Sequence, residues 1–191
     1  MKRDIIAIVG DAGISDNEKK YRLAYEAGKA LIDNGFRVQS GGLNGIMKAA
    51  FMGARDSNKY KEGDTIAILP GFDPGCANEF ADIIVPTGLD VYRNVIVANA
   101  SAVVAIGGGA GTLSEVSMAW ALGRMIIGYT DVDGWSAKLA GAPIDQRKRY
   151  ENIENDMVYP AKDAGEMIAL IKKHLASYNK YHKGIAYIKQ Q

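Results

Sequence analysis

The stretch from Ala102 to Gly123, AVVAIGGGAGTLSEVSMAWALG, constrains this chain more than any other part of it. An apolar, β-rich segment at 102–106 runs into four glycines within five residues: Gly107, Gly108, Gly109 and Gly111. Thr112 then opens a helical pattern. Glycine lets a backbone come close to an anion, and the free N–H groups of a first helical turn point at it. This order of strand, glycine loop and helix predicts a binding site for a phosphorylated small molecule.

Strand-like and helical segments alternate along the 191 residues. The predicted strands are 4–9, 36–39, 65–69, 82–85, 102–106, 125–129 and a last short one at 156–159. The predicted helices are 15–34, 46–55, 90–100, 112–122 and 164–177. This alternation predicts an α/β, Rossmann-like, doubly wound sheet of six or seven mostly parallel strands with helices on both faces. We expect one domain over 1–191, with 134–155 at the sheet edge and a loosely ordered tail at 178–191.

In such a sheet, ligands bind beyond the carboxyl ends of the strands, where the chain order reverses. Four loops are expected at that edge: 10–15, 40–45, 70–79 and 107–112. The second contains Gly41, Gly42 and Gly45, opens the helix 46–55, and predicts a second anion contact with Asn44 as a side-chain donor. A plain tight turn is the alternative for these glycines. Asp11 is a further candidate contact in the first loop.

Composition narrows the chemistry. Cys76 is the only cysteine, which excludes an internal disulfide and a cysteine-based zinc site. The two histidines, His174 and His182, lie far from the glycine loops, which argues against a Ser-His-Asp hydrolase or a histidine-bound metal. We therefore expect no metal and no required cofactor, and chemistry that uses carboxylates, Arg, Tyr or the backbone.

Charge and hydropathy limit which partners and which cellular location are expected for this chain. The 23 Lys and Arg residues nearly cancel the 22 Asp and Glu residues, so the net charge gives no case for nucleic acid or membrane. The chain has no apolar run of transmembrane length, and its first residues lack the layout of a signal peptide. The expectation is a cytoplasmic protein.

Two common nucleotide-binding classes do not match. The first strand leads into GDAGIS rather than GxGxxG, and the second strand ends in Ser40-Gly41-Gly42 where an acid for the adenine ribose is expected. This argues against a dinucleotide oxidoreductase. No GKS or GKT follows any glycine run, so a P-loop is excluded as well.

The motif GGGAGTLSE resembles the PGGxGTxxE signature of the lonely-guy (LOG) family within the SLOG superfamily, a group once labelled "possible lysine decarboxylases". SGGLNGIMKAAFMGA resembles that family's glycine turn and following helix, and the likeness extends to about residue 130. LOG enzymes hydrolyse the N-glycosidic bond of nucleoside 5′-monophosphates. The molybdenum-cofactor-carrier-like branch is more similar still, because it has GGGxGTLSE and an RN pair that Arg93 and Asn94 match.

The resemblance implies that Glu115 and Arg93 are catalytic if the chain is an enzyme. It also implies that Arg93, Asn94, Thr112, Glu115 and the two sets of glycines bind the ligand. Two departures stand out: Gly107 replaces the signature Pro, and an ungapped count places the hydrolases' catalytic Arg on Tyr92. One residue on a helix is a turn of about 100°, so Arg93 is displaced from the hydrolase position by that angle.

Each of these two side chains has a structural alternative. Thr112 and Glu115 have the spacing of a capping box, and a first-turn carboxylate is favoured by the helix dipole. Arg93 could form a surface salt bridge. In the functional interpretation, Glu115 accepts ribose hydroxyls or stabilises an oxocarbenium ion, and Arg93 neutralises a phosphate.

The leading hypothesis is the binding of a phosphorylated nucleotide-like or molybdopterin-type ligand, as in the cofactor-carrier branch. The alternative is a nucleoside 5′-monophosphate phosphoribohydrolase. A third class, the binding of single-stranded DNA as in DprA-like proteins, is disfavoured by the near-neutral charge.

The helices predicted at 90–100 and 112–122 are apolar nearly all the way round. The first carries Val91, Tyr92, Val95, Ile96, Val97 and Ala98, and the second carries Leu113, Val116, Met118, Ala119, Trp120 and Leu122. A helix on one sheet buries one stripe only, so a second covering layer is expected, most simply another copy of the chain. The resemblance agrees, since LOG-like proteins are dimers and carrier-like ones form larger assemblies. We expect a homodimer or higher homo-oligomer through these helices.

Overall fold

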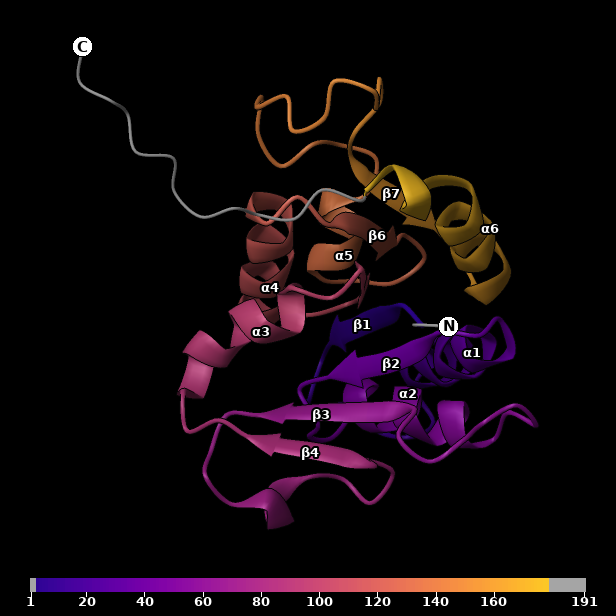
Figure 1. Cartoon of the computed structure of the whole chain (residues 1–191), viewed down its shortest axis with the longest axis vertical. Helices are drawn as coiled ribbons and strands as arrows, with labels where there is room; N and C mark the ends of the chain where they lie inside the picture. The colour runs from indigo at the N-terminus through magenta and orange to yellow at the C-terminus, as the bar shows by residue number, and fades with distance from the viewer. Residues whose placement is uncertain (1–2, 179–191) are drawn as a thin grey trace.

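A computed structural model describes residues 3–178 of the chain. Seven parallel strands form one sheet in the order β4-β3-β2-β1-β5-β6-β7 (Figure 1). The strands are β1 (Ile5–Gly10), β2 (Arg37–Ser40), β3 (Thr65–Leu69), β4 (Ile83–Pro86), β5 (Ala102–Ile106), β6 (Met125–Tyr129) and β7 (Val158–Ala161). This arrangement confirms the predicted doubly wound α/β fold. The chain order reverses between β1 and β5, which lie side by side.

Helices cover both faces of the sheet. The α-helices are α1 (Lys19–Asp33), α2 (Ile46–Arg55), α3 (Asn94–Ala98), α4 (Ala110–Ala121), α5 (Trp135–Leu139) and α6 (Ala164–His174). Three 3₁₀ turns are η1 (Pro74–Cys76), η2 (Asp90–Arg93) and η3 (Leu175–Ser177). None of the described helices is long and apolar enough to cross a bilayer.

The core has two layers because strand side chains alternate between the faces. On β1, Ile6 and Ile8 pack with α1, α2 and α6, whereas Ala7 and Val9 pack with α3 and α4. The central strands β5 and β6 are buried along their whole length. A sheet covered on both faces holds its carboxyl edge rigidly, and the glycine loops leave from that edge.

The helix predicted at 90–100 is shorter than expected and begins irregularly. Asp90 has a φ of 51°, in the left-handed region, so a regular helix cannot start at this residue. The chain forms the 3₁₀ turn η2 first, and α3 follows from Asn94 to Ala98. The helix predicted to open at Thr112 begins two residues earlier, at Ala110.

The expectation that α4 needs a second copy of the chain to cover it is wrong for Trp120. This side chain is 1% exposed and is covered by the chain's own segment 135–150. Its Nε1 donates to Asp145 Oδ1 at 3.1 Å, and the Arg149 guanidinium lies 3.5 Å from the ring centroid. The segment after β6, predicted at the sheet edge, thus supplies much of the missing layer.

That same segment also reaches the edge strand. Gly141 N donates to Val158 O at 2.8 Å and Val158 N donates to Ala142 O at 3.0 Å, so the chain runs alongside the start of β7. The tail predicted at 178–191 lies outside the described residues except for Tyr178. The Tyr178 side chain is buried, and its hydroxyl contacts Asp156 Oδ1 at 2.7 Å.

Candidate functional site

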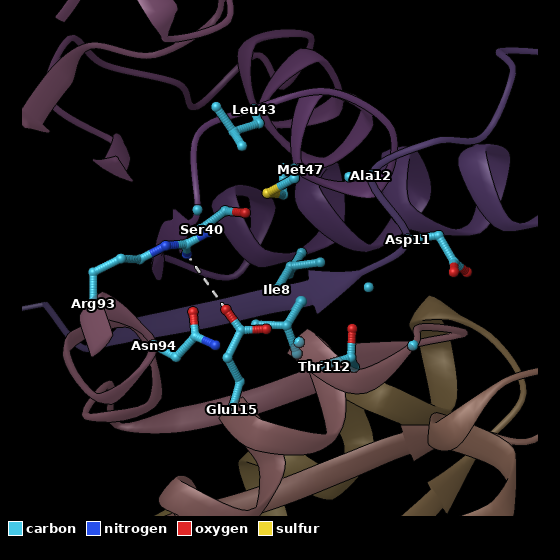
Figure 2. A pocket seen from close by; sticks show the side chains of 15 residues that line it. Ile8, Asp11, Ala12, Ser40, Leu43, Met47, Arg93, Asn94, Thr112 and Glu115 are labelled. Atoms are coloured by element: carbon cyan, nitrogen blue, oxygen red, sulfur yellow. Dashed lines mark hydrogen bonds and ion pairs between the residues drawn. The ribbon is translucent and has the colours of Figure 1, made fainter. Parts of the chain in front are cut away.

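A cavity of about 260 Å³ lies at the carboxyl edge of the sheet, where the chain leaves β1 and β5 toward opposite faces of the sheet. Open α/β sheets bind ligands at this topological switch point. Residues from β1 and its loop, from β2 and α2, from the η2–α3 junction and from the start of α4 form its walls (Figure 2). The lining residues are Ile8, Val9, Gly10, Asp11, Ala12, Ser40, Gly41, Leu43, Met47, Arg93, Asn94, Gly109, Gly111, Thr112 and Glu115.

The N-terminus of α4 borders this cavity with unpaired donors. No side chain caps the helix, whose N-cap residue is Gly109. Within residues 3–178, no acceptor is paired with the N–H groups of Gly109, Ala110, Gly111 or Thr112. Gly109, Gly111 and Thr112, three of the residues predicted to contact a ligand, line the cavity. Free N–H groups at a helix start attract an anion.

The first two glycines of the same loop are used differently. Gly107 N donates to Ser136 Oγ at 2.8 Å, and Gly108 N donates to Asp11 Oδ2 at 2.9 Å. Neither glycine lines the cavity. Their N–H groups therefore serve the protein's own packing, and the donors available to a ligand begin at Gly109.

Arg93 and Glu115 meet inside the cavity, one reaching from η2 and the other from α4 (Figure 2). Arg93 Nη1 lies 3.4 Å from Glu115 Oε1, and the two residues are 8% and 7% exposed. Burial raises the pKa of Glu115 to about 7, although the Arg93 guanidinium acts to lower it. Burial also lowers the pKa of Arg93.

The contact between these side chains decides both structural alternatives. Glu115 is the sixth residue of α4 and accepts from Arg93, so it forms no capping box with Thr112. Arg93 is buried, so its ion pair is not a surface salt bridge. The ungapped count had placed the hydrolases' arginine on Tyr92, but Tyr92 is 76% exposed and the inward side chain is Arg93.

Two polar atoms in the cavity wall lack partners. Across residues 3–178, three buried side-chain polar atoms have no hydrogen-bond partner, and two of them are Ser40 Oγ and Arg93 Nε. Both residues line the cavity, and Figure 2 shows Ser40 beside the Arg93 guanidinium in that view. Unpaired buried polar atoms are rare in folded proteins, so a pair of them in one cavity marks a place for a polar ligand.

The glycine turn after β2 is built around these residues. A Cβ on Gly41 would lie 2.5 Å from both Arg93 Nη atoms, so only glycine leaves room for the guanidinium. A Cβ on Gly45 would lie 2.3 Å from the carbonyl oxygen of Asp11. Among the residues predicted in this turn, Gly41 lines the cavity, whereas Gly42, Asn44 and Gly45 do not. Asn44 is exposed.

Asn94, the other half of the RN pair, also lines the cavity. Its Nδ2 donates to Ser114 Oγ at 3.3 Å, which joins the start of α3 to α4. The third loop expected at this edge, 70–79, contributes no lining residue. Its Asn78 instead supports the turn after β2, donating from Nδ2 to Leu43 O at 2.8 Å and to Gly42 O at 3.0 Å.

Sequence reasoning missed three contributors to the site. Ser40 ends β2, Met47 lies in the first turn of α2, and Ser136 holds the glycine loop from α5. The position of Ser40 directly before two glycines at the carboxyl edge was a signal that could have found it. Ser136 lies 29 positions after Gly107 and belongs to no motif, so only the tertiary structure reveals it.

Several known proteins are similar to this chain in sequence or in fold. A protein from Archaeoglobus fulgidus, described as uncharacterized, is 40% identical over 127 residues, which are 66% of this chain and 80% of that protein. The molybdenum cofactor binding protein of Rippkaea orientalis is 29% identical with a TM-score of 0.73, covering 91% of this chain and 98% of that one. The molybdenum cofactor carrier protein of Chlamydomonas reinhardtii is 27% identical with a TM-score of 0.71, covering 91% and 99%.

These neighbours confirm the resemblance to the SLOG superfamily and to its molybdenum-cofactor-carrier-like branch. The model of the SLOG cluster4 family matches residues 3–168, nearly the whole described chain. The chain belongs to the SLOG cluster4 family.

Proposed function

We propose that this protein binds a phosphorylated small molecule, nucleotide-like or of the molybdopterin type, with the phosphate at the N-terminus of α4. The observation that best supports the proposal is the environment of the Arg93 side chain. Its guanidinium is buried in the cavity; among residues 3–178 its Nε has no partner, and its one ion pair is the 3.4 Å contact with Glu115. A buried guanidinium with five donors and so few acceptors is complementary to an anion.

The rest of the cavity fits the same ligand. The unpaired N–H groups from Gly109 to Thr112 provide a second set of donors beside the guanidinium. Arg can grip a phosphate with two parallel hydrogen bonds, which makes it a stronger phosphate ligand than Lys. Glu115 would repel a phosphate, so its role is to accept hydroxyl or amino donors from the organic part of the molecule.

The size of the site and the family both support this proposal. A volume of about 260 Å³ lies just below the roughly 300–1,000 Å³ typical of drug-sized ligands, which suits a small ligand. The similar proteins from Rippkaea orientalis and Chlamydomonas reinhardtii are described as binding or carrying the molybdenum cofactor. We extend that ligand class to this chain.

The test is a calorimetric titration with a panel of nucleoside 5′-monophosphates and a pterin monophosphate, each paired with its dephosphorylated form. The phosphorylated member of at least one pair should bind at least tenfold more tightly, since it alone reaches the α4 donors and Arg93. Equal affinity for every pair would contradict a phosphate site.

The second candidate, a nucleoside 5′-monophosphate phosphoribohydrolase, is favoured by the environment of Glu115. A buried carboxyl with a pKa of about 7 beside an arginine is suited to acid–base or charge-stabilising work on a glycosidic bond. Incubation with nucleoside monophosphates should then release free base. Glu115→Gln should abolish that release while sparing phosphate affinity. Binding without release would favour the carrier function, and unchanged release by the variant would remove Glu115 from the chemistry.

We also propose that a second copy of the chain covers the apolar face formed by Leu89, Val91, Tyr92, Val95 and Ile96. These side chains of η2 and α3, together with the turn before them, remain exposed; Val91 is 64% exposed. Such a contiguous apolar surface is typical of a protein–protein interface, and a second copy of the chain is the simplest partner for it. Because Trp120 is covered by its own chain, it cannot serve as the test residue.

Light scattering should therefore report more than one 20.6 kDa chain at micromolar concentration. Tyr92→Glu should dissociate the assembly, because it places a charge on the proposed interface. Tyr92→Phe is the matched control, since it changes the same exposed residue but keeps an apolar ring on this face. A wild-type monomer, or equal dissociation by both variants, would contradict the proposed interface.

A further inference from the structure

The first two residues of α5, Trp135 and Ser136, hold the glycine loop through their backbone and the serine hydroxyl. Ser136 Oγ accepts from Gly107 N at 2.8 Å and donates to Tyr129 O at 2.8 Å. Ser136 N donates to Gly107 O and Trp135 N donates to Gly108 O, both at 3.0 Å. Ser136 is 1% exposed, so these hydrogen bonds are sheltered from water.

These contacts determine where the next N–H groups point. In a trans peptide, the N–H of one residue points opposite to the carbonyl of the residue before it. The Gly107 carbonyl faces α5, so the Gly108 N–H points away from α5 and meets Asp11 Oδ2 at 2.9 Å. The Gly108 carbonyl also faces α5, so the Gly109 N–H points away from it, on the side of the cavity that Gly109 lines.

Asp11 completes this arrangement from the other side of the loop. Its Oδ2 also accepts from Lys20 Nζ at 2.8 Å, and Lys20 pairs with Asp133 at 3.0 Å. A Cβ on Gly107 would lie 2.4 Å from Asp11 Oδ2, and Gly107 has a φ of 67°. Proline at this position has a φ near −65° and no N–H for Ser136, so the loop conformation requires the departure from the hydrolase signature.

We propose that Asp11, Trp135 and Ser136, here called the loop clamp, orient the N–H groups of Gly109 to Thr112 toward the ligand's phosphate. Ser136 is then a positioning residue for anion binding, although it does not touch the ligand. The inference rests on the proposed phosphate site at α4. It gives a function to the start of α5, which none of the sequence motifs includes.

The experiment is a titration of the ¹⁵N-labelled full chain with inorganic phosphate, followed by NMR at the backbone amides. In the wild type, the amides of Gly109, Gly111 and Thr112 should shift more than those of Gly107 and Gly108, which are already paired. Ser136→Ala should weaken phosphate binding about tenfold, the usual effect of one lost hydrogen bond.

Ser57→Ala is the matched control. The Ser57 hydroxyl is likewise buried, donates to Asp33 Oδ1 at 2.6 Å and accepts from Lys59 N at 3.0 Å, yet it does not line the cavity. It should leave phosphate affinity within twofold of the wild type. Equal affinities for Ser136→Ala and Ser57→Ala would overturn the clamp alone. A wild type that binds no phosphate would overturn both the clamp and the proposed function.

A second pair of variants covers the case in which Ser136→Ala does not fold. Trp135→Ala removes the indole and keeps the N–H that donates to Gly108 O. Trp135→Pro removes both, at the first position of α5, where proline is tolerated. The proline variant should bind phosphate about tenfold more weakly than the alanine variant. Equal binding by these two variants would overturn the proposal.

Discussion

The two glycine turns of this protein look alike in sequence but use glycine for different purposes. In the turn after β2, neighbours fill the space that a Cβ would need: Arg93 at Gly41 and a backbone carbonyl at Gly45. In the turn after β5, a Cβ on Gly109 or Gly111 would meet nothing within 4 Å. The first turn is glycine-rich so that protein groups can pack closely. The last glycines of the second leave space beside free N–H groups, where a ligand can approach.

The largest effect should come from Gly45→Ala in the first turn. Gly45 has a φ of 62°, and a Cβ there would collide with the carbonyl oxygens of Asp11 and Ala12. Backbone strain and overpacking together should lower the free energy of unfolding by roughly 3–5 kcal/mol. Urea unfolding of the variant measures this difference. A loss of unfolding free energy below about 1 kcal/mol would show that close packing in the turn after β2 does not require glycine at this position.

The next largest effect should be a pH dependence of the free energy of unfolding that arises from Glu115. Its folded-state pKa of about 7 is above the ordinary value near 4.3. The native state therefore binds the proton more tightly than the unfolded state. Stability from this group is present below about pH 4 and is lost as pH rises to 7, a change of about 3 kcal/mol.

Comparison of the wild type with Glu115→Gln isolates this contribution, because glutamine does not titrate. The difference in unfolding free energy between the two proteins should shift in favour of the variant as pH rises from 4 to 7, and stay constant above about pH 8. A difference that does not change with pH would show that Glu115 has an ordinary pKa.

Gly41, in the turn after β2, leaves room for the Arg93 guanidinium. Removing the charge of Arg93 should weaken ligand binding. Arg93→Met should lower affinity for a phosphorylated ligand about 100-fold, the effect of losing charge-assisted hydrogen bonds. Gly41→Ala should reduce affinity through the same side chain, because its Cβ displaces the guanidinium. The double variant should therefore bind no more weakly than Arg93→Met alone. Additive losses, measured by calorimetry, would assign Gly41 a separate contact with the ligand.

The smallest effect should come from Gly111→Ala in the second turn. Gly111 lies inside α4 with open space around it, so alanine should stabilise the helix by about 0.5–1 kcal/mol. The added methyl group would narrow the approach to the N–H groups, so phosphate affinity should fall several-fold. Thermal unfolding and phosphate titration measure the two effects. A lower unfolding temperature for the variant would show that Gly111, like Gly41 and Gly45, is needed for close packing.

Much of the fold could be predicted from local patterns. The strands at 65–69, 102–106 and 125–129 and the helix at 46–55 have the predicted bounds, because each is a continuous apolar or amphipathic run with clear ends. The position of the candidate site at the carboxyl edge was also predictable, because each glycine turn directly follows a predicted strand. The interruption at Asp90 was not predictable, because a positive φ at a non-glycine residue depends on its surroundings.

The parts of the site that failed prediction depend on contacts between distant segments. Arg93 points inward because the 3₁₀ turn η2 changes the phase of the helix, which a count along the sequence cannot detect. Trp120 looked exposed because its cover is the polar segment around Asp145 and Arg149. Ser136 shows no signal in sequence, since its partners lie on two other elements.

A crystal structure of the protein soaked with a nucleoside 5′-monophosphate would show where the phosphate binds. We predict the phosphate against the N-terminus of α4, within hydrogen-bond distance of the N–H groups of Gly109 to Thr112, with the Arg93 guanidinium turned toward it. A phosphate bound elsewhere on the molecule, with that helix terminus empty, would contradict a phosphate site at the N-terminus of α4.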